Sequence, residues 1–334
     1  MASAEQIKAL IESHVHQDDD RFVAVALQVA ARAARQGHGR LAEEIKALID
    51  DAKARGAQGS KRPIPIAAPR GDLIGLLSVC YPQLRLTDMV LAGPIHARLS
   101  RILQEHRAQS KLRSHGLRPR RKLLLVGPPG SGKTMTAGAL AGELHLALYV
   151  ILLDGLITKF MGETAAKLRL VFEAIAEQRG VYLFDEFDAI GSERARGNDV
   201  GEIRRVLNSF LQFLEQDDSP SLLVAATNHQ QALDAALFRR FDDVIEYGIP
   251  DAVLAEVVLR NKLAAFDVTD LNFAEAARCA DGLSYGEITQ ACEAAAKDAV
   301  LADSTTVATA ALVAALDERR SVRRPDQGDA RTDV

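Results

Sequence analysis

The sequence contains no apolar run long enough to cross a membrane. No stretch approaches the roughly 18 consecutive apolar residues that suggest a spanning helix. The first residues, MASAEQIKALIESHVH, carry acidic side chains and no apolar core, so they do not have the pattern of a secretory signal. Cysteine is scarce, and Cys80, Cys279 and Cys292 lack metal-site spacing. These absences predict a cytoplasmic protein with reduced thiols and no membrane partner.

Protease signatures are missing as well. HExxH does not occur, and no Ser/His/Asp cluster is evident by motif, so any proteolysis would need a separate protein. The net charge of −4 argues against a dedicated polyanion binder. Hydrophobic residues make up 48% and charged residues 26% of the 334 positions, which is typical of a globular protein with a sizeable core. This length predicts about two to three domains.

A P-loop motif is the strongest feature that is present. The sequence GPPGSGKT lies between the apolar run Leu123–Val126 and a helical pattern, which is the strand, turn and helix context that this motif requires. Lys133 is expected to reach the β- and γ-phosphates of a nucleoside triphosphate, and the Thr134 hydroxyl to ligate Mg²⁺. The expected nucleotide-binding residues are Gly127, Pro128, Pro129, Gly130, Ser131, Gly132, Lys133, Thr134 and Met135.

Further polar residues follow later apolar runs. Asp185 and Glu186 come directly after Val181–Phe184, where Asp185 can hold Mg²⁺ and Glu186 can act as general base toward water. Asn228 ends the next apolar run, and its amide could contact the γ-phosphate. Arg239 and Arg240 are adjacent, and a triphosphatase benefits from an arginine that neutralises developing charge. If that arginine came from a neighbouring subunit, hydrolysis would require assembly.

Strand and helix patterns alternate through the middle of the chain. They predict an α/β fold with a doubly wound, parallel, five-stranded sheet and a ligand at the carboxyl ends of its strands. The predicted strands are 123–126, 148–152, 181–184, 222–226 and 244–247. The predicted domains are a helical bundle of three helices (1–55), a linker (56–70), a large α/β domain (71–249), an all-helical lid (250–319) and a disordered tail (320–334).

From about Leu86 to Leu316 the chain resembles a classical AAA (AAA+) ATPase. The resemblance rests on GPPGSGKT, LFDEFD, SLLVAATN and DAALFRRFD, in family order and spacing. It implies ATP hydrolysis with Mg²⁺ in a single-ring homo-oligomer, expected to be a hexamer. Lys133 and Thr134 then match Walker A, Asp185 and Glu186 match Walker B, Asn228 matches sensor 1, and Arg239 with Arg240 match paired arginine fingers.

Two regions fit the family less closely. In Gly282–Glu287, Tyr285 stands where the family usually has glycine, and an arginine-type sensor 2 is absent, so this segment departs from the family's pattern for lid contact to nucleotide. The N-terminal bundle is similar to MIT domains only in size and pattern. It is expected to bind a substrate or a partner protein.

The segment Lys159, Phe160, Met161 and Gly162 resembles the family's pore loop. Phe and Met side chains on such loops could grip extended polypeptide without sequence preference. Taken alone, Phe-Met before a helix is more often a hydrophobic staple, and the family resemblance is what favours the pore loop. A second, charged pore segment is expected near Arg194–Asp199.

Three functions remain open from the sequence. The leading one is a ring-forming ATPase that unfolds, threads or remodels protein substrates. A nucleic-acid-associated protein such as a helicase loader is disfavoured, because the basic stretch 98–122 has no interleaved aromatic residues for base stacking. The basic residues of the stretch 98–122 are Arg98, Arg101, Arg107, Lys111, Arg113, Arg118, Arg120, Arg121 and Lys122, opposed within the stretch only by Glu105. The third function is an ATP-controlled assembly switch.

Overall fold

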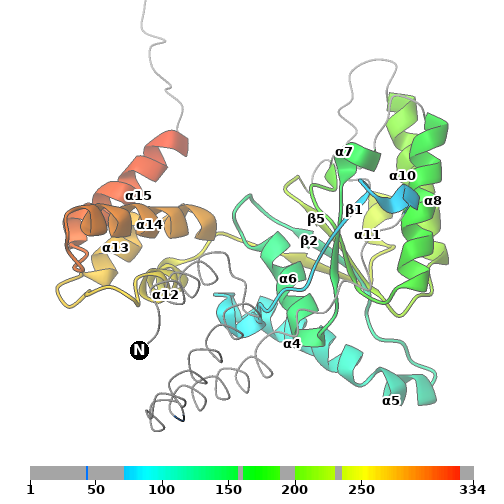
Figure 1. Cartoon of the computed structure of the whole chain (residues 1–334), viewed down its shortest axis with the longest axis horizontal. Helices are drawn as coiled ribbons and strands as arrows, with labels where there is room; N and C mark the ends of the chain where they lie inside the picture. Colours follow the sequence, from blue (N-terminus) through cyan, green and yellow to red (C-terminus); the bar gives the residue numbers. More distant parts are fainter. Residues whose placement is uncertain (1–42, 44–70, 157–160, 189–199, 230–234, 324–334) are drawn as a thin grey trace, which may run out of the picture. The chain divides into compact units, whose positions relative to one another are not determined.

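The computed structural model describes residues 43, 71–156, 161–188, 200–229 and 235–323 (Figure 1). Several predictions therefore lie outside the described residues. They concern the N-terminal bundle, the linker, the pore-loop residues Lys159 and Phe160, the second pore segment and the end of the tail.

A six-stranded sheet forms the centre of the large domain. Its strands are β1 (Leu77–Cys80), β2 (Lys122–Val126), β3 (Leu148–Ile151), β4 (Val181–Phe184), β5 (Leu222–Thr227) and β6 (Asp243–Glu246). Their order is β1-β3-β4-β5-β2-β6, and the strands from β2 to β6 pair in parallel.

The parallel part of the sheet agrees with the prediction, but the predicted number of strands is wrong. β1 pairs antiparallel with β3 at the edge of the sheet, with Leu77 opposite Ile151. This strand has only four residues, too few to give a clear alternating pattern in the sequence. An edge strand also needs only one neighbour, so its sequence is weakly constrained.

Helices cover both faces of the sheet (Figure 1). Successive strand residues point to opposite faces, so Leu123 and Leu125 belong to one buried cluster and Leu124 and Val126 to the other. This is why the strands are apolar throughout rather than alternating. The helices of the domain are η1 (Gly71–Leu73), η2 (Leu86–Asp88), α4 (Gly93–Arg107), α5 (Gln109–Ser114), α6 (Lys133–Leu144), α7 (Leu153–Leu156), α8 (Met161–Glu177), α10 (Val200–Gln216) and α11 (Ala235–Phe238).

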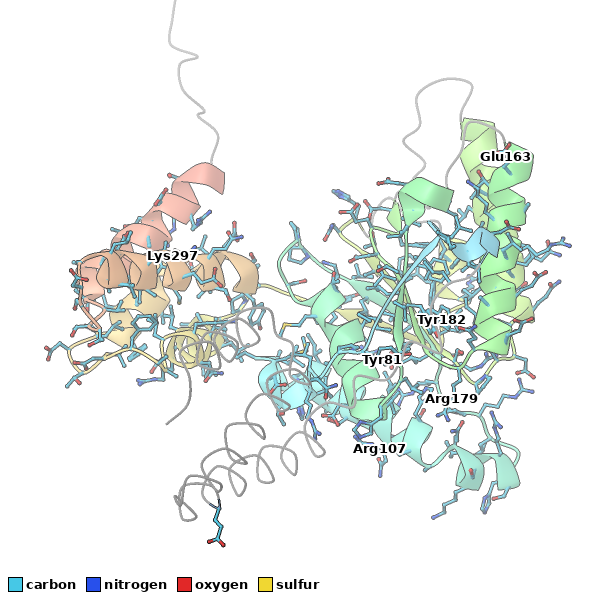
Figure 2. The ribbon with its side chains drawn as sticks, in the orientation of Figure 1. Tyr81, Arg107, Glu163, Arg179, Tyr182 and Lys297 are labelled. Carbon is cyan, nitrogen blue, oxygen red and sulfur yellow. The ribbon has the colours of Figure 1, made fainter. Side chains whose placement is uncertain are left out.

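The face under α8 and α10 is rich in aromatic side chains. Tyr149 and Tyr182 stack with ring centroids 4.5 Å apart, and Tyr182 is labelled within the sheet in Figure 2. The Tyr182 hydroxyl donates to the carbonyl oxygens of Ala174 (3.0 Å) and Gln178 (2.8 Å). Burial of the ring therefore leaves its polar atom satisfied, as a core tyrosine requires.

Four helices after β6 form a separate small domain. They are α12 (Ala252–Lys262), α13 (Phe273–Cys279), α14 (Tyr285–Leu301) and α15 (Thr309–Arg323). Leu259, Ile288, Leu312 and Leu316 are fully buried in its own core. α15 continues past residue 319 to Arg323, so the prediction of a disordered tail from residue 320 is wrong for these residues. The Arg320 guanidinium donates to the carbonyl oxygen of Cys279, which ties the last part of α15 to α13.

Candidate functional site

The turn after β2 forms a cradle of backbone next to the start of α6. Gly127 has no room for a side chain, because a Cβ there would lie 2.5 Å from the carbonyl oxygen of Tyr247. Gly130 has φ +72°, a left-handed conformation, and a Cβ there would lie 2.7 Å from the Ser284 hydroxyl. The glycines of the motif thus permit both the turn and its close packing against β6 and the lid. This geometry fits the phosphates of a nucleotide.

Lys133 is buried at the centre of this cradle. Its Nζ donates to the carbonyl oxygens of Gly127 (2.9 Å) and Pro128 (2.8 Å) and to Asn228 Oδ1 (2.8 Å). Burial lowers the pKa of Lys133, while the charges of Asp185 and Asp188 oppose that shift. The sequence prediction that Lys133 and Asn228 serve one site is supported, because β5 lies beside β2.

Thr134 and Asp185 converge from different elements. The Thr134 hydroxyl, in the first turn of α6, donates to Asp185 Oδ2 at 2.7 Å after the end of β4. A hydroxyl and a carboxylate oxygen are the donors that Mg²⁺ prefers, so this pair fits the ion that the sequence implies. Both residues line the same cavity as the P-loop.

Glu186 has an unusual backbone conformation. Its φ is +49°, in the left-handed region that side-chain-bearing residues rarely adopt, and its N–H donates to Asp185 Oδ1 at 3.0 Å. The residue is exposed and lines the cavity beside Lys133 and Thr134. Strained residues of this kind are concentrated at functional sites. The structure thus places Glu186 in the cavity, and its role as general base stays a prediction.

The cavity has a volume of about 660 Å³ and includes residues that the sequence analysis missed. Those from the segment before α4 are Asp88, Met89 and Val90, and those from the small domain are Val258, Asn261, Lys262, Thr289, Gln290 and Glu293. No motif distinguishes these positions. They are brought together by packing between segments that are far apart in sequence.

The small domain contacts the P-loop through backbone. The Gly286 N–H donates to the carbonyl oxygen of Gly130 at 3.0 Å, at the start of α14. A Cβ on Gly286 would lie 3.2 Å from the Cα of Gly130. Tyr285 precedes this contact and lines the cavity. The lid therefore reaches the P-loop even though Tyr285 replaces the glycine that the family usually has.

Asp188 and Thr227 support the end of β5. The Thr227 hydroxyl donates to Asp188 Oδ1 at 3.0 Å and accepts from the His229 N–H at 3.0 Å. Thr227 is buried and immediately precedes Asn228. The pair thus fixes the backbone on both sides of Asn228. The sequence analysis did not predict this role for Asp188. Its place in the segment LFDEFD, close to Asp185 and Glu186, is the feature of the sequence that could have indicated it.

Arg239 and Arg240 lie at the other end of the sheet from the P-loop. They precede β6, whose first residue, Asp243, pairs with Leu123 near the start of β2, whereas the P-loop follows the end of β2. Five strand residues separate the two edges, a distance of about 16 Å. Although both arginines are described, neither lines the cavity.

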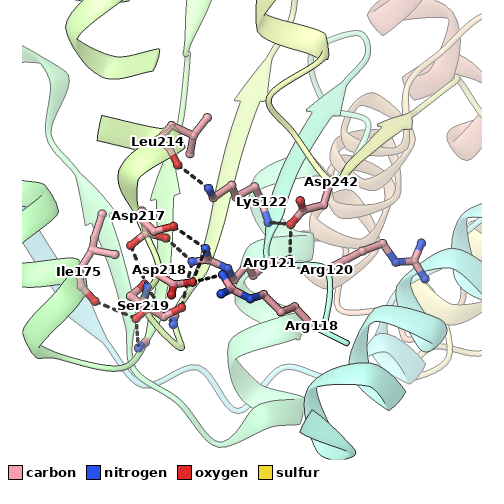
Figure 3. Close-up of polar contacts among 12 residues, drawn as sticks. Arg118, Arg120, Arg121, Lys122, Ile175, Leu214, Asp217, Asp218, Ser219 and Asp242 are labelled. Carbon is pink, nitrogen blue, oxygen red and sulfur yellow. Dashed lines mark hydrogen bonds and ion pairs between the residues drawn. The ribbon is translucent and has the colours of Figure 1, made fainter. Parts of the chain in front are cut away.

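The basic stretch is largely neutralised by acidic residues of the same fold (Figure 3). Arg121, for example, has a side chain only 11% exposed and pairs with Asp217, which is 3% exposed. The ion pairs are Arg98–Asp243, Arg101–Glu105, Arg107–Glu143, Arg118–Asp218, Arg120–Glu105, Arg120–Asp243, Arg121–Asp217 and Arg121–Asp218. These pairs leave much less positive charge for a polyanion than the sequence alone indicates.

Other predictions have simpler outcomes. Met161 and Gly162, two of the predicted pore-loop residues, are the first residues of α8. Within the described ranges, no helix is both long and apolar enough to span a membrane. Cys80, Cys279 and Cys292 are free thiols.

The geometry defines a class of nucleotide-binding protein: a P-loop α/β domain with an acidic pair, a polar strand end and a helical lid. The family model for the ATPase family associated with various cellular activities (AAA) matches residues 123–249. An uncharacterised AAA family ATPase of Sinorhizobium fredii is 33% identical over 305 residues, which cover 90% of each chain. The chain therefore belongs to the AAA family, and it binds and hydrolyses ATP.

Two further relatives are longer proteins. The ATP-dependent zinc metalloprotease FtsH 4 of Sphaerobacter thermophilus is 31% identical over 257 residues, which cover 75% of this chain and 37% of that protein. The proteasome-activating nucleotidase 1 of Haloferax volcanii is 34% identical over 200 residues, which cover 58% of this chain and 49% of that protein. The chain thus matches less than half the length of each of these two relatives.

Proposed function

We propose that the chain is a ring-forming ATPase that unfolds, threads or remodels protein substrates, and that each active site is completed by arginine from a neighbouring subunit. The observation that carries this proposal is the position of Arg239 and Arg240 on the edge of the sheet away from their own P-loop. An arginine there is too far from its own nucleotide, at about 16 Å along the strands, to contact the γ-phosphate. A second copy of the chain is the simplest source of a nucleotide that the arginines can reach.

The other proposed roles belong to residues that line the cavity of a single subunit. Thr134 and Asp185 would hold Mg²⁺, which neutralises phosphate charge when it is bound. Lys133 binds phosphate oxygen, and its low exposure strengthens that interaction because water competes poorly there. Glu186 accepts a proton from the attacking water, and Asn228 orients the γ-phosphate or that water.

Trans-complementation tests the assembly of the site. The variant Glu186→Gln lacks the base but keeps its arginines, whereas the double variant Arg239→Ala/Arg240→Ala keeps the base. Each is expected to be nearly inactive alone. A mixture assembled before ATP is added should regain activity, because some sites receive the base from one variant and the arginines from the other. A mixture as inactive as its components would contradict action in trans.

Protein substrates are supported by the pore-loop resemblance at residues 159–162 and by the similarity to two relatives, a metalloprotease and a proteasome-activating nucleotidase. The ion pairing of the basic stretch disfavours nucleic acid. Steady-state ATP hydrolysis should rise with an unfolded polypeptide and lose that response in Phe160→Ala, while the control Phe160→Tyr keeps it. Stimulation by DNA alone, unaffected by Phe160, would favour the nucleic-acid alternative. No response to either would favour an assembly switch.

A further inference from the structure

Two buried hydroxyl groups meet behind the P-loop. Tyr247 follows β6, is only 5% exposed and belongs to the same buried cluster as Ala137 and Leu140 of α6. Its hydroxyl lies 2.7 Å from Oγ1 of Thr136, a fully buried residue in the first turn of α6. A hydroxyl that is buried without a partner costs free energy. The two groups therefore satisfy each other among apolar side chains.

The direction of these hydrogen bonds follows from the protons available. The Thr136 hydroxyl donates to the carbonyl oxygen of Gly132 at 3.0 Å. Because threonine has a single hydroxyl proton, it accepts from Tyr247. Burial raises the pKa of Tyr247 to about 12, so the phenol keeps its proton at neutral pH. A chain of two hydrogen bonds thus runs from Tyr247 through Thr136 to the backbone of the P-loop.

The backbone of Tyr247 holds the other end of the P-loop. Its N–H donates to the carbonyl oxygen of Val126 at 2.7 Å, at the end of β2. Its carbonyl oxygen lies so close to Gly127 that a Cβ on this glycine would be 2.5 Å away. Tyr247 therefore contacts the first glycine of the loop directly and the last one, Gly132, through Thr136.

Gly132 is the point where the loop passes into α6. Its φ is +97°, and its carbonyl oxygen also accepts the backbone N–H of Thr136 at 2.9 Å. The first N–H groups of a helix have no partner within it, and they are the groups that a phosphate accepts from. Their direction depends on the orientation of the first turn. A side-chain hydrogen bond to the Gly132 carbonyl restricts that orientation.

We propose that Tyr247 is a positioning residue for the phosphates of ATP, and that its hydroxyl acts on the P-loop through Thr136. In this role, which rests on the phosphate binding of the proposed function, Tyr247 fixes both ends of the loop from behind. Although both residues are described, neither Tyr247 nor Thr136 lines the cavity. A phenylalanine would fill the same space without donating to Thr136, so the hydroxyl itself can be tested.

Removal of single hydroxyl groups tests this role. Tyr247→Phe keeps the ring and loses the first hydrogen bond, whereas Thr136→Val keeps the shape of the side chain and loses both. Each should weaken ADP binding by about 3- to 10-fold in calorimetric titrations of the full chain. Thr136→Ser keeps the hydroxyl and should bind ADP like wild type. The double variant Tyr247→Phe/Thr136→Val should bind ADP no more weakly than Thr136→Val.

Two measurements separate positioning from a general loss of stability. Adenosine lacks the phosphates that a P-loop binds, so Tyr247→Phe should leave adenosine affinity unchanged in competition with a fluorescent ATP analogue. Tyr149→Phe is the matched control, because the buried Tyr149 hydroxyl also donates to one side chain, Gln178 Oε1 at 3.0 Å, but belongs to β3. It should lower the urea midpoint of unfolding about as much as Tyr247→Phe and leave ADP affinity at the wild-type value.

The outcomes distinguish the role of Tyr247 from the phosphate site itself. Weaker ADP binding in Tyr247→Phe and Thr136→Val, with unchanged adenosine binding and a normal Tyr149→Phe, supports the positioning role. Equal losses for ADP and adenosine would overturn it, because the whole cavity would then be loosened. If Tyr247→Phe binds ADP like wild type while Lys133→Ala does not, only the role of Tyr247 is wrong. If Lys133→Ala also binds ADP normally, the phosphates bind elsewhere and both proposals are wrong.

Discussion

Lys133 Nζ and Asn228 Oδ1 lie 2.8 Å apart, although 95 positions separate the two residues in sequence. The contact exists because β5 pairs with β2 in parallel, with Val126 opposite Thr227 at the carboxyl ends. It places two polar side chains of the P-loop cavity at one point of the sheet.

Lys133→Ala is expected to weaken ATP binding by about 10- to 100-fold, the loss that follows from removing charge-assisted hydrogen bonds. Titration of a fluorescent ATP analogue measures this change. Lys297→Ala is the matched control, because Lys297 is an exposed lysine on α14 (Figure 2). Normal affinity in Lys133→Ala would show that the nucleotide binds elsewhere.

Glu186→Gln should bind ATP normally and hydrolyse it about 10²- to 10⁴-fold more slowly, because the amide cannot accept the proton of water. Single-turnover hydrolysis separates this chemical step from product release. We also expect the variant to accumulate as the ATP-bound oligomer, measured by sedimentation. Wild-type turnover would assign the base to another residue.

Asp188→Ala removes the acceptor for the buried Thr227 hydroxyl and should displace Asn228. We expect kcat to fall by about tenfold or more while KM changes little, since the effect acts on the orientation of reacting groups. Thr227→Val removes the same hydrogen bond. The double variant should be no slower than the slower single variant, because the two changes disrupt one interaction. Additive losses would indicate separate roles.

Asp217→Ala removes the closer and more buried of the two carboxylates that pair with the Arg121 guanidinium, and leaves only the exposed Asp218 at 3.4 Å. The free energy of unfolding should fall by about 3–5 kcal/mol, as is typical when one member of a buried ion pair is removed. Urea unfolding followed by circular dichroism measures this change. The control Arg101→Ala removes the partner of Glu105 in a pair whose arginine is 67% exposed, and should cost about 0–1 kcal/mol. Equal losses would contradict the difference in burial.

Glu105 gives stability a defined dependence on pH. Hydrogen bonds from the Arg120 side chain lower the pKa of Glu105 from 4.5 to about 2. Because the folded pKa is below the unfolded value, the stabilisation is complete above about pH 4.5 and is lost as pH falls toward about 2. Between about pH 5 and pH 3, Glu105→Gln should therefore lose less stability than wild type in urea titrations. Parallel pH profiles would contradict the assignment to Glu105.

The sequence predicted the features that are encoded locally. The P-loop and the five parallel strands were found because glycines, apolar runs and terminal polar residues are close together in the chain. Lys133, Thr134, Asp185, Glu186 and Asn228 do meet in one cavity, as the alternating pattern required. The roles of these residues in catalysis remain predictions.

Other features depend on contacts between distant segments. The basic stretch looked unopposed because the carboxylates that pair with it, such as Asp217 and Asp243, lie far along the chain. β1 was missed because its pairing with β3 is not encoded by its own four residues. The left-handed backbone of Glu186 has no local sequence signal, since any L-residue disfavours it.

The contact between Gly130 and Gly286 brings two backbones together without intervening side chains. A flexible side chain could absorb a movement of the P-loop, but two peptide units in direct contact cannot. Gly286 belongs to α14, whose 17 residues extend about 26 Å. A displacement of the P-loop would therefore act directly on the first turn of a long helix, and a rotation of that helix would move its far end most.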